Sequence, residues 1–278
     1  MTHTTDSGFE QKMESFLTTL SLPPTLTVES RPDGILIVTL NRADKRNALD
    51  DTTVLGLEQL FGTIPLTVRA VVLRGAGEHF CAGLDLNSLA DQDVSQRIAR
   101  TKLWNRAFEK IEFGQAPVIT AMQGAVIGGG LELACATHIR VADSSVFYGL
   151  PEGQRGIYLG GGGSVRLPRL IGLPRMMDMM LTGRSYDAAS GHSIGLSQYL
   201  VSAGNAFEKA LELAAAVAKN APLSNFGVIQ ALPRIAAGHS DSGYLMEALI
   251  SALAQDAPEA KQRIESFLAG RAPQVDVT

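Results

Sequence analysis

Residues 117–170 decide the fold, and they read PVITAMQGAVIGGGLELACATHIRVADSSVFYGLPEGQRGIYLGGGGSVRLPRL. The apolar run at 117–122 predicts a buried strand. Three glycines, Gly128–Gly130, follow it, and the next residues, LELACA at 131–136, favour a helix. Glycines at a strand-to-helix turn let backbone N–H groups approach a ligand, and the helix N-terminus adds a positive end. We therefore predict a turn that can hold an oxyanion.

Two glutamates accompany these glycines. Glu132 lies in the predicted first turn of the helix, and Glu152 precedes a second glycine run at 160–163. A glycine run alone is usually a tight turn, and a single glutamate is usually solvated. The second run could admit a close ligand or ease a turn, and we favour the turn. The functional interpretation depends on the ordered combination of these features.

Length and composition restrict the class of protein. The chain has 278 residues, of which 45% are hydrophobic and 19% charged, so we expect one large domain, or a domain with a small appendage. The net charge of -4 argues against nucleic-acid binding, which needs a basic surface. We expect no membrane span, no signal peptide and, with two cysteines that lack metal-ligand spacing, a reducing cytoplasm. The scattered histidines predict no metal site.

The order of predicted elements indicates an α/β core followed by helices. Strands are expected over 26–30, 35–40, 68–74, 117–122, 139–142 and 146–148, with a turn and strand over 194–201. Helices are expected over 9–20, 50–62, 91–113, 131–136, 170–181, 187–193, 206–219, 224–237, 243–254 and 258–268. We divide the chain into an N-terminal extension at 1–24, a core at 25–205 and a helical region at 206–278. The apolar helix faces of the last region suggest packing on a neighbouring subunit.

Two loops before the glycine turn are candidates for ligand binding. The run VRAVVLR at 68–74 is typical of a parallel strand buried on both faces. The loop at 75–86 follows its C-terminal end, where open α/β sheets bind ligands. The loop NRADKRNAL at 41–49 carries three cations, which could be solvated or could contact a phosphate.

Four motifs in this order resemble the crotonase superfamily, which includes enoyl-CoA hydratases and isomerases. They are KRNAL at 45–49, FCAGLDL at 80–86, GAVIGGGLELA at 124–134, and YGLPE at 148–152 with RLPR at 166–169. The resemblance runs from about residue 26 to the end. It implies an α/β crotonase-like spiral of repeated ββα units with a helical C-terminal trimerisation region. It also implies an acyl-CoA substrate and a trimer or dimer of trimers.

The resemblance implies roles for individual residues. The N–H groups of Leu84 and Gly129 match the oxyanion hole of the superfamily, and Glu132 and Glu152 match the two glutamates of its hydratases. The positions expected to bind the CoA or the substrate are Lys45, Ala82, Asp85, Leu86, Asn87 and Gly128. No cofactor is implied, because the substrate itself carries the coenzyme A.

Hydration of an enoyl thioester needs these groups. The addition of water puts negative charge on the thioester oxygen, which two N–H donors stabilise. One carboxyl group can help activate the water while the other protonates Cα, and burial of the pair pushes their pKa values apart. We expect Glu152 to be chiefly the acid and Glu132 to help activate the water.

Two departures narrow the resemblance. Thr137-His138 stands where the superfamily usually has Cys-Asp, and residues 156–164 lack its usual proline. These features, with SVRLPRLIG at 164–172 and NAPLSNF at 220–226, are similar to the methylthioacryloyl-CoA hydratase group, which acts in dimethylsulfoniopropionate breakdown and releases methanethiol. A general short-chain enoyl-CoA hydratase stays open. His138 could reach the pocket, but we favour a local partner behind the helix.

Other functions of the same scaffold are a Δ3,Δ2-enoyl-CoA isomerase, an acyl-CoA hydrolase and a non-catalytic acyl-CoA-binding protein. An isomerase or hydrolase needs one carboxylate, so an exposed second glutamate would favour it. An inert binder needs neither carboxylate. RNA binding, which occurs in some of the superfamily, would require a basic surface.

Overall fold

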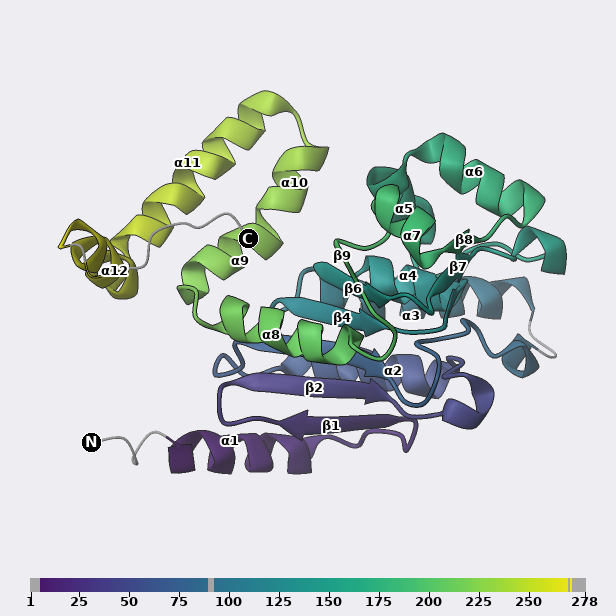
Figure 1. Cartoon of the computed structure of the whole chain (residues 1–278), viewed down its shortest axis with the longest axis horizontal. Helices are drawn as coiled ribbons and strands as arrows, with labels where there is room; N and C mark the ends of the chain where they lie inside the picture. The colour runs from purple at the N-terminus through teal and green to yellow at the C-terminus, as the bar shows by residue number, and fades with distance from the viewer. Residues whose placement is uncertain (1–5, 90–92, 270, 272–278) are drawn as a thin grey trace. The chain divides into compact units, whose positions relative to one another are not determined.

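The computed structural model describes residues 6–89, 93–269 and 271, with the backbone alone for 6–12 and 89. The chain forms two compact units, residues 1–218 and 219–278 (Figure 1). The first unit contains a six-stranded sheet in the order β1-β2-β3-β4-β6-β9. These strands are β1 (Leu26–Ser30), β2 (Ile35–Leu40), β3 (Ala70–Gly75), β4 (Val118–Met122), β6 (Ile139–Asp143) and β9 (Tyr199–Val201).

The large sheet is parallel apart from its first pair. β1 and β2 form an antiparallel hairpin, and Gly34 adopts φ +82° in the predicted turn between them. β2, β3, β4, β6 and β9 pair in parallel. The central residues of β3, Val71, Val72 and Leu73, are fully buried, as its apolar sequence predicts.

A second, three-stranded sheet has the order β5-β7-β8. Its strands are β5 (Ala125–Ile127), β7 (Phe147–Gly149) and β8 (Tyr186–Asp187). The chain alternates between the sheets: β4 is followed by β5 and a helix, and β6 by β7 and further helices. This alternation confirms the prediction of repeated ββα units.

The described residues of the first unit also form helices. They are α1 (Asp6–Thr19), α2 (Asp51–Thr63), α3 (Val94–Glu112), α4 (Gly129–Cys135), α5 (Gly163–Ile171), α6 (Leu173–Thr182), α7 (Ala188–Ser193) and α8 (Ala206–Ala218). One turn of 3₁₀-helix spans each of Ala43–Lys45, Leu86–Leu89 and Gly153–Arg155. α8 packs on β3 and β4 through Ala206, Ala210 and Ala214, whose small side chains allow close approach (Figure 1).

Residues 170–181 do not form the single helix that the sequence analysis expects. α5 ends at Ile171 and α6 begins at Leu173, because Gly172 adopts φ +82° and Pro174 starts the second helix. α5 itself begins inside the second glycine run, for which the sequence analysis favours a turn. The glycine run at 160–163 therefore lies at the N-terminus of α5.

The second unit is entirely helical among its described residues. It contains α9 (Pro222–Gln230), α10 (Leu232–Ala237), α11 (Ser240–Asp256) and α12 (Pro258–Leu268). The predicted helix at 224–237 is divided at Ala231, because Pro233 opens α10. Self-association through 206–278 stays a prediction, and within that range α8 belongs to the first unit.

No described helix combines the length and the apolar character needed to cross a membrane. Within the same described ranges, histidine, cysteine, aspartate and glutamate side chains form no group of three or more that could hold a metal ion.

Candidate active site

The first glycine run forms the tight connection between β5 and α4. Gly128 adopts φ +52°, which would strain any side chain. A Cβ on Gly129 would lie 2.9 Å from Cζ3 of Trp104, and a Cβ on Gly130 would lie 2.4 Å from the carbonyl oxygen of Cys81. The run is therefore a close approach between elements, and it places Glu132 in the first turn of α4 as predicted.

The second glycine run holds Glu132. The N–H groups of Gly161 and Gly163 both donate to Glu132 Oε1, each at 2.8 Å. Glu132 is only 2% exposed, so these bonds replace the water that a carboxylate otherwise requires. Arg166 steadies the run, because its Nη1 donates to the Gly161 carbonyl at 2.9 Å. The glycines thus donate to a carboxylate, beyond easing a turn.

Glu152 has a different environment. It follows β7 and is 6% exposed, and its Oε2 is buried without a hydrogen-bond partner among the described residues. A Cβ on Gly128 would lie 2.5 Å from Glu152 Oε1, so the absence of a side chain at Gly128 makes room for this carboxyl group. The two glutamates therefore differ in the donors available to them.

The pKa values of the two carboxyl groups follow from these surroundings. Burial, with a smaller contribution from the nearby charge of Glu132, raises the pKa of Glu152 to about 7, although its own N–H opposes the shift. Burial also raises the pKa of Glu132, against the N–H groups of the glycine run and the positive charge of Arg166. Donors stabilise the charged form of Glu132, whereas Glu152 keeps an unpaired oxygen. With a pKa of about 7 and an unpaired oxygen, Glu152 can carry a proton near neutral pH.

Two backbone amides lie side by side near the glutamates. The nitrogen of Leu84 would be 3.4 Å from a Cβ on Gly129, and the nitrogen of Gly129 would be 3.0 Å from a Cβ on Gly83. Neither N–H donates to another described residue. Hydrogen bonds between Leu49 and the neighbours of Leu84 fix the first amide. Two such donors can bind one oxyanion.

Four predicted site residues line one cavity of about 260 Å³: Leu84, Gly129, Glu132 and Glu152. Sequence reasoning missed the wall that α3 contributes, which consists of Arg97, Arg100, Thr101 and Trp104. Their spacing of three, four and seven residues places them on one helix face. That spacing was the available signal, and it includes the single tryptophan of the chain.

The residues predicted to bind CoA do not line this cavity. Lys45, Leu86 and Asn87 are exposed, and Ala82 is partly buried in the same loop as Leu84. Asp85 pairs with Arg42 at 2.8 Å. Partial burial acts to raise the pKa of Asp85. The hydrogen bond from the Asn87 N–H and the pairing with Arg42 have the larger combined effect, so the pKa of Asp85 is lowered.

His138 has partners outside the cavity, as the sequence analysis favoured. Its Nδ1 accepts from the Val118 N–H at 2.9 Å, and its Nε2 donates to the Glu112 carbonyl at 3.0 Å. Burial lowers the pKa of His138 to about 4, so the ring is neutral at neutral pH. We assign it a structural role behind α4.

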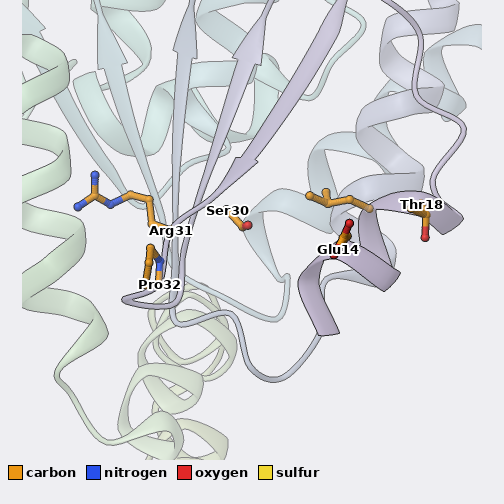
Figure 2. Close-up of a pocket in the computed structure, with 6 residues that line it drawn as sticks. Glu14, Thr18, Ser30, Arg31 and Pro32 are labelled. Atoms are coloured by element: carbon orange, nitrogen blue, oxygen red, sulfur yellow. The ribbon is translucent and has the colours of Figure 1, made fainter. Parts of the chain in front are cut away.

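A larger hollow of about 490 Å³ lies between α1 and the end of β1, and it lacks comparable chemistry. Figure 2 shows Arg31 directed away from Glu14 and Thr18. Arg31 instead pairs with Asp33 at 3.3 Å, and both side chains are exposed. The polar groups of this hollow are in contact with solvent, so we place the functional site in the smaller cavity.

The chain matches known proteins over most of its length. The profile of the family described as enoyl-CoA hydratase/isomerase matches residues 30–272. An enoyl-CoA hydratase of Mycobacterium tuberculosis is 32% identical over 259 residues, which cover 89% of this chain and 97% of the relative. The 2,3-dehydroadipyl-CoA hydratase of Escherichia coli is 32% identical over 252 residues, which cover 88% of this chain and 96% of the relative.

Solved structures confirm the predicted fold. The crystal structure of a candidate enoyl-CoA hydratase from Rhodopseudomonas palustris has a TM-score of 0.87 and 54% sequence identity, covering 90% of this chain and 97% of that one. The crystal structure of an enoyl-CoA hydratase from Bacillus anthracis has a TM-score of 0.84 and 30% sequence identity. The match covers 90% of this chain and 98% of that one. The chain therefore belongs to the enoyl-CoA hydratase/isomerase family, as an enzyme of the crotonase superfamily.

Proposed function

We propose that the protein is an enoyl-CoA hydratase that adds water across the α,β double bond of a short acyl-CoA thioester. The observation that supports this most is the pair of buried glutamates in one cavity, one held by two N–H donors and the other with an unpaired oxygen. An isomerase or a hydrolase needs one carboxylate and would tolerate an exposed second one. Both carboxyl groups here are more than nine-tenths buried.

In the proposed reaction, the thioester oxygen lies between the N–H groups of Leu84 and Gly129. Water attacks Cβ, and the electrons of the double bond move onto the thioester as an enolate whose oxygen these amides stabilise. Glu132, held as a carboxylate, accepts the proton that the water loses. Glu152, held protonated, donates a proton to Cα. Proton exchange between the two carboxyl groups restores the starting state.

The loop at 82–87 connects this chemistry to the CoA. Ala82, Asp85, Leu86 and Asn87 flank Leu84, so a CoA held along the loop would bring its thioester to the Leu84 N–H. Lys45 is exposed in the neighbouring 3₁₀ turn and would contact a CoA phosphate. No cofactor besides the CoA of the substrate is proposed.

Methylthioacryloyl-CoA is the narrower candidate substrate. It depends on the resemblance of the glycine run at 160–163 and of Thr137-His138 to the hydratases that act on it. On that substrate, hydration at Cβ gives a hemithioacetal that loses methanethiol, and thioester hydrolysis follows. The relatives compared above carry names that do not include this acyl group, so the assignment needs a direct assay.

The test supplies the purified protein with crotonyl-CoA and methylthioacryloyl-CoA in parallel. Loss of the enoyl absorbance and release of free thiol are followed separately. We expect enoyl loss with crotonyl-CoA, without thiol. Thiol from methylthioacryloyl-CoA alone would support the narrower substrate, and no enoyl loss with either would contradict the proposed function.

A further inference from the structure

The wall that α3 contributes to the cavity is polar and positively charged. Trp104 lies next to Gly129, whose added Cβ would be 2.9 Å from the indole ring. Arg100 precedes Trp104 by four residues on the same helix face, at a typical separation of about 5–6 Å between Cβ atoms. The cavity lining therefore continues from Gly129 past Trp104 to Arg100, which gives an acyl chain bound at the Gly129 N–H a path along α3.

Arg100 is buried and fixed in place. Its Nε donates to Asp51 Oδ1 at 2.7 Å, its Nη2 donates to Ser88 Oγ at 2.6 Å, and the side chain is 8% exposed. Trp104 Nε1 donates to the same Asp51 oxygen at 3.0 Å. The third nitrogen, Nη1, is buried without a hydrogen-bond partner among the described residues. A buried, unpaired donor on a charged group is unfavourable, and a bound acceptor would relieve it.

We infer that Arg100 Nη1 binds a carboxylate at the far end of the acyl chain, so that the substrates are CoA thioesters of short unsaturated dicarboxylic acids. This inference rests on the proposed hydratase function. An alkyl end offers no acceptor to Nη1. Arg97 lines the same wall. A guanidinium donor binds a charged carboxylate more strongly than a neutral acceptor, so Nη1 of Arg100 favours an anion.

The methylthioacryloyl group fits this wall less well. Its chain ends in a methyl thioether, and a thioether sulfur is only a weak acceptor. Arg100 Nη1 would stay unpaired beside it. The glutamate pair could hydrate either a dicarboxylic enoyl-CoA or methylthioacryloyl-CoA. The α3 wall is the feature expected to favour the dicarboxylic substrate.

The experiment compares matched substrates. Glutaconyl-CoA and 2,3-dehydroadipyl-CoA are each assayed against the neutral isostere in which an isopropyl group replaces the carboxylate, with crotonyl-CoA as the reference for hydration itself. We expect kcat/KM to favour at least one dicarboxylate over its isostere by about tenfold or more. Arg100→Met should lower that ratio by about tenfold to a hundredfold, and Arg100→Lys should lower it less.

The matched control is Arg106→Met. Arg106 lies on the same helix, but it is 58% exposed and pairs with Glu58 at 3.0 Å, so the ratio should stay at its wild-type value. Thermal melting of every variant checks that it is folded. The preference of the wild-type enzyme for a dicarboxylate over its isostere is measured without any variant, so it tests the inference even if a variant does not fold.

Two outcomes would overturn the inference and leave the proposed function intact. The first is hydration of crotonyl-CoA with no preference for either dicarboxylate. The second is a wild-type preference that a folded Arg100→Met protein retains. If no substrate is hydrated, including crotonyl-CoA, the proposed function itself fails.

Discussion

The two glycine runs of this protein consist of the same residue type, but their backbone N–H groups have different partners. In the run at 128–130, the missing side chains make room for Trp104, Cys81 and the carboxyl group of Glu152, and the Gly129 N–H stays available to a ligand. In the run at 160–163, two N–H groups are already bonded to Glu132. The first run leaves a donor open, and the second uses its donors within the protein.

This difference gives the two carboxyl groups of one cavity different hydrogen-bond surroundings. Glu132 receives the donors of the second run, and Glu152 receives space from the first run but no donor for its Oε2. A base and an acid can thus be obtained from one residue type, because the backbone around each favours a different charge state.

The largest expected effect comes from removal of either carboxyl group. Glu132→Gln and Glu152→Gln should each lower kcat for crotonyl-CoA by about a hundredfold to ten-thousandfold, since each removes a proton-transfer group. Steady-state kinetics on folded variants check this, and near wild-type rates in both would exclude the mechanism.

A smaller effect tests how the second run positions Glu132. A Cβ on Gly163 would lie 2.8 Å from Glu132 Cγ and 2.9 Å from Oε1, so Gly163→Ala should displace the carboxylate and lower kcat by about tenfold to a hundredfold. Gly62→Ala is the matched control, because Gly62 lies in α2 outside the cavity and its Cβ would come no closer than 4.0 Å to Lys110 Cδ. Equal losses in both variants would show that the run has no specific hold on Glu132.

The pH dependence of activity tests the acid. Because burial raises the pKa of Glu152 to about 7, kcat/KM should fall as pH rises above about 7, by about tenfold for each further pH unit. A pH profile with crotonyl-CoA measures it. A kcat/KM that stays constant to alkaline pH would mean that Glu152 is not the proton donor.

The smallest effect is on stability. The pKa of Glu152 rises from 4.5 to about 7 on folding, so the folded state binds more protons than the unfolded state in this window, and the free energy of unfolding falls as pH rises through it. Glutamine cannot ionise, so Glu152→Gln should melt above the wild type at pH 8, by about 2–4 °C for each kcal/mol recovered. A melting difference that does not depend on pH would contradict the assignment.

The sequence predicts the local features of this site well. The turn into α4 and the position of Glu132 in its first turn depend on neighbouring residues, and so does the buried strand β3. The function of Gly161 and Gly163 depends on how α5 approaches α4, which is a tertiary contact without a local signal. The break at Gly172 was missed because the apolar spacing continues across it.

The α3 wall shows a different limit. The spacing of Arg97, Arg100, Thr101 and Trp104 was visible in the sequence, but a polar helix face is ordinarily solvated. Only the burial of Arg100, and the Asp51 and Ser88 that hold it, distinguish this face from an exposed one.

The most direct test of the account is a ¹³C NMR titration of the protein labelled at its glutamate carboxyl carbons, with Glu132→Gln and Glu152→Gln for assignment. We predict a resonance that titrates near pH 7, is absent from Glu152→Gln and persists in Glu132→Gln, although the lost neighbouring charge lowers its midpoint. If that resonance disappears from Glu132→Gln and persists in Glu152→Gln, the two carboxyl groups have the opposite protonation states and the proposed division between acid and base is wrong.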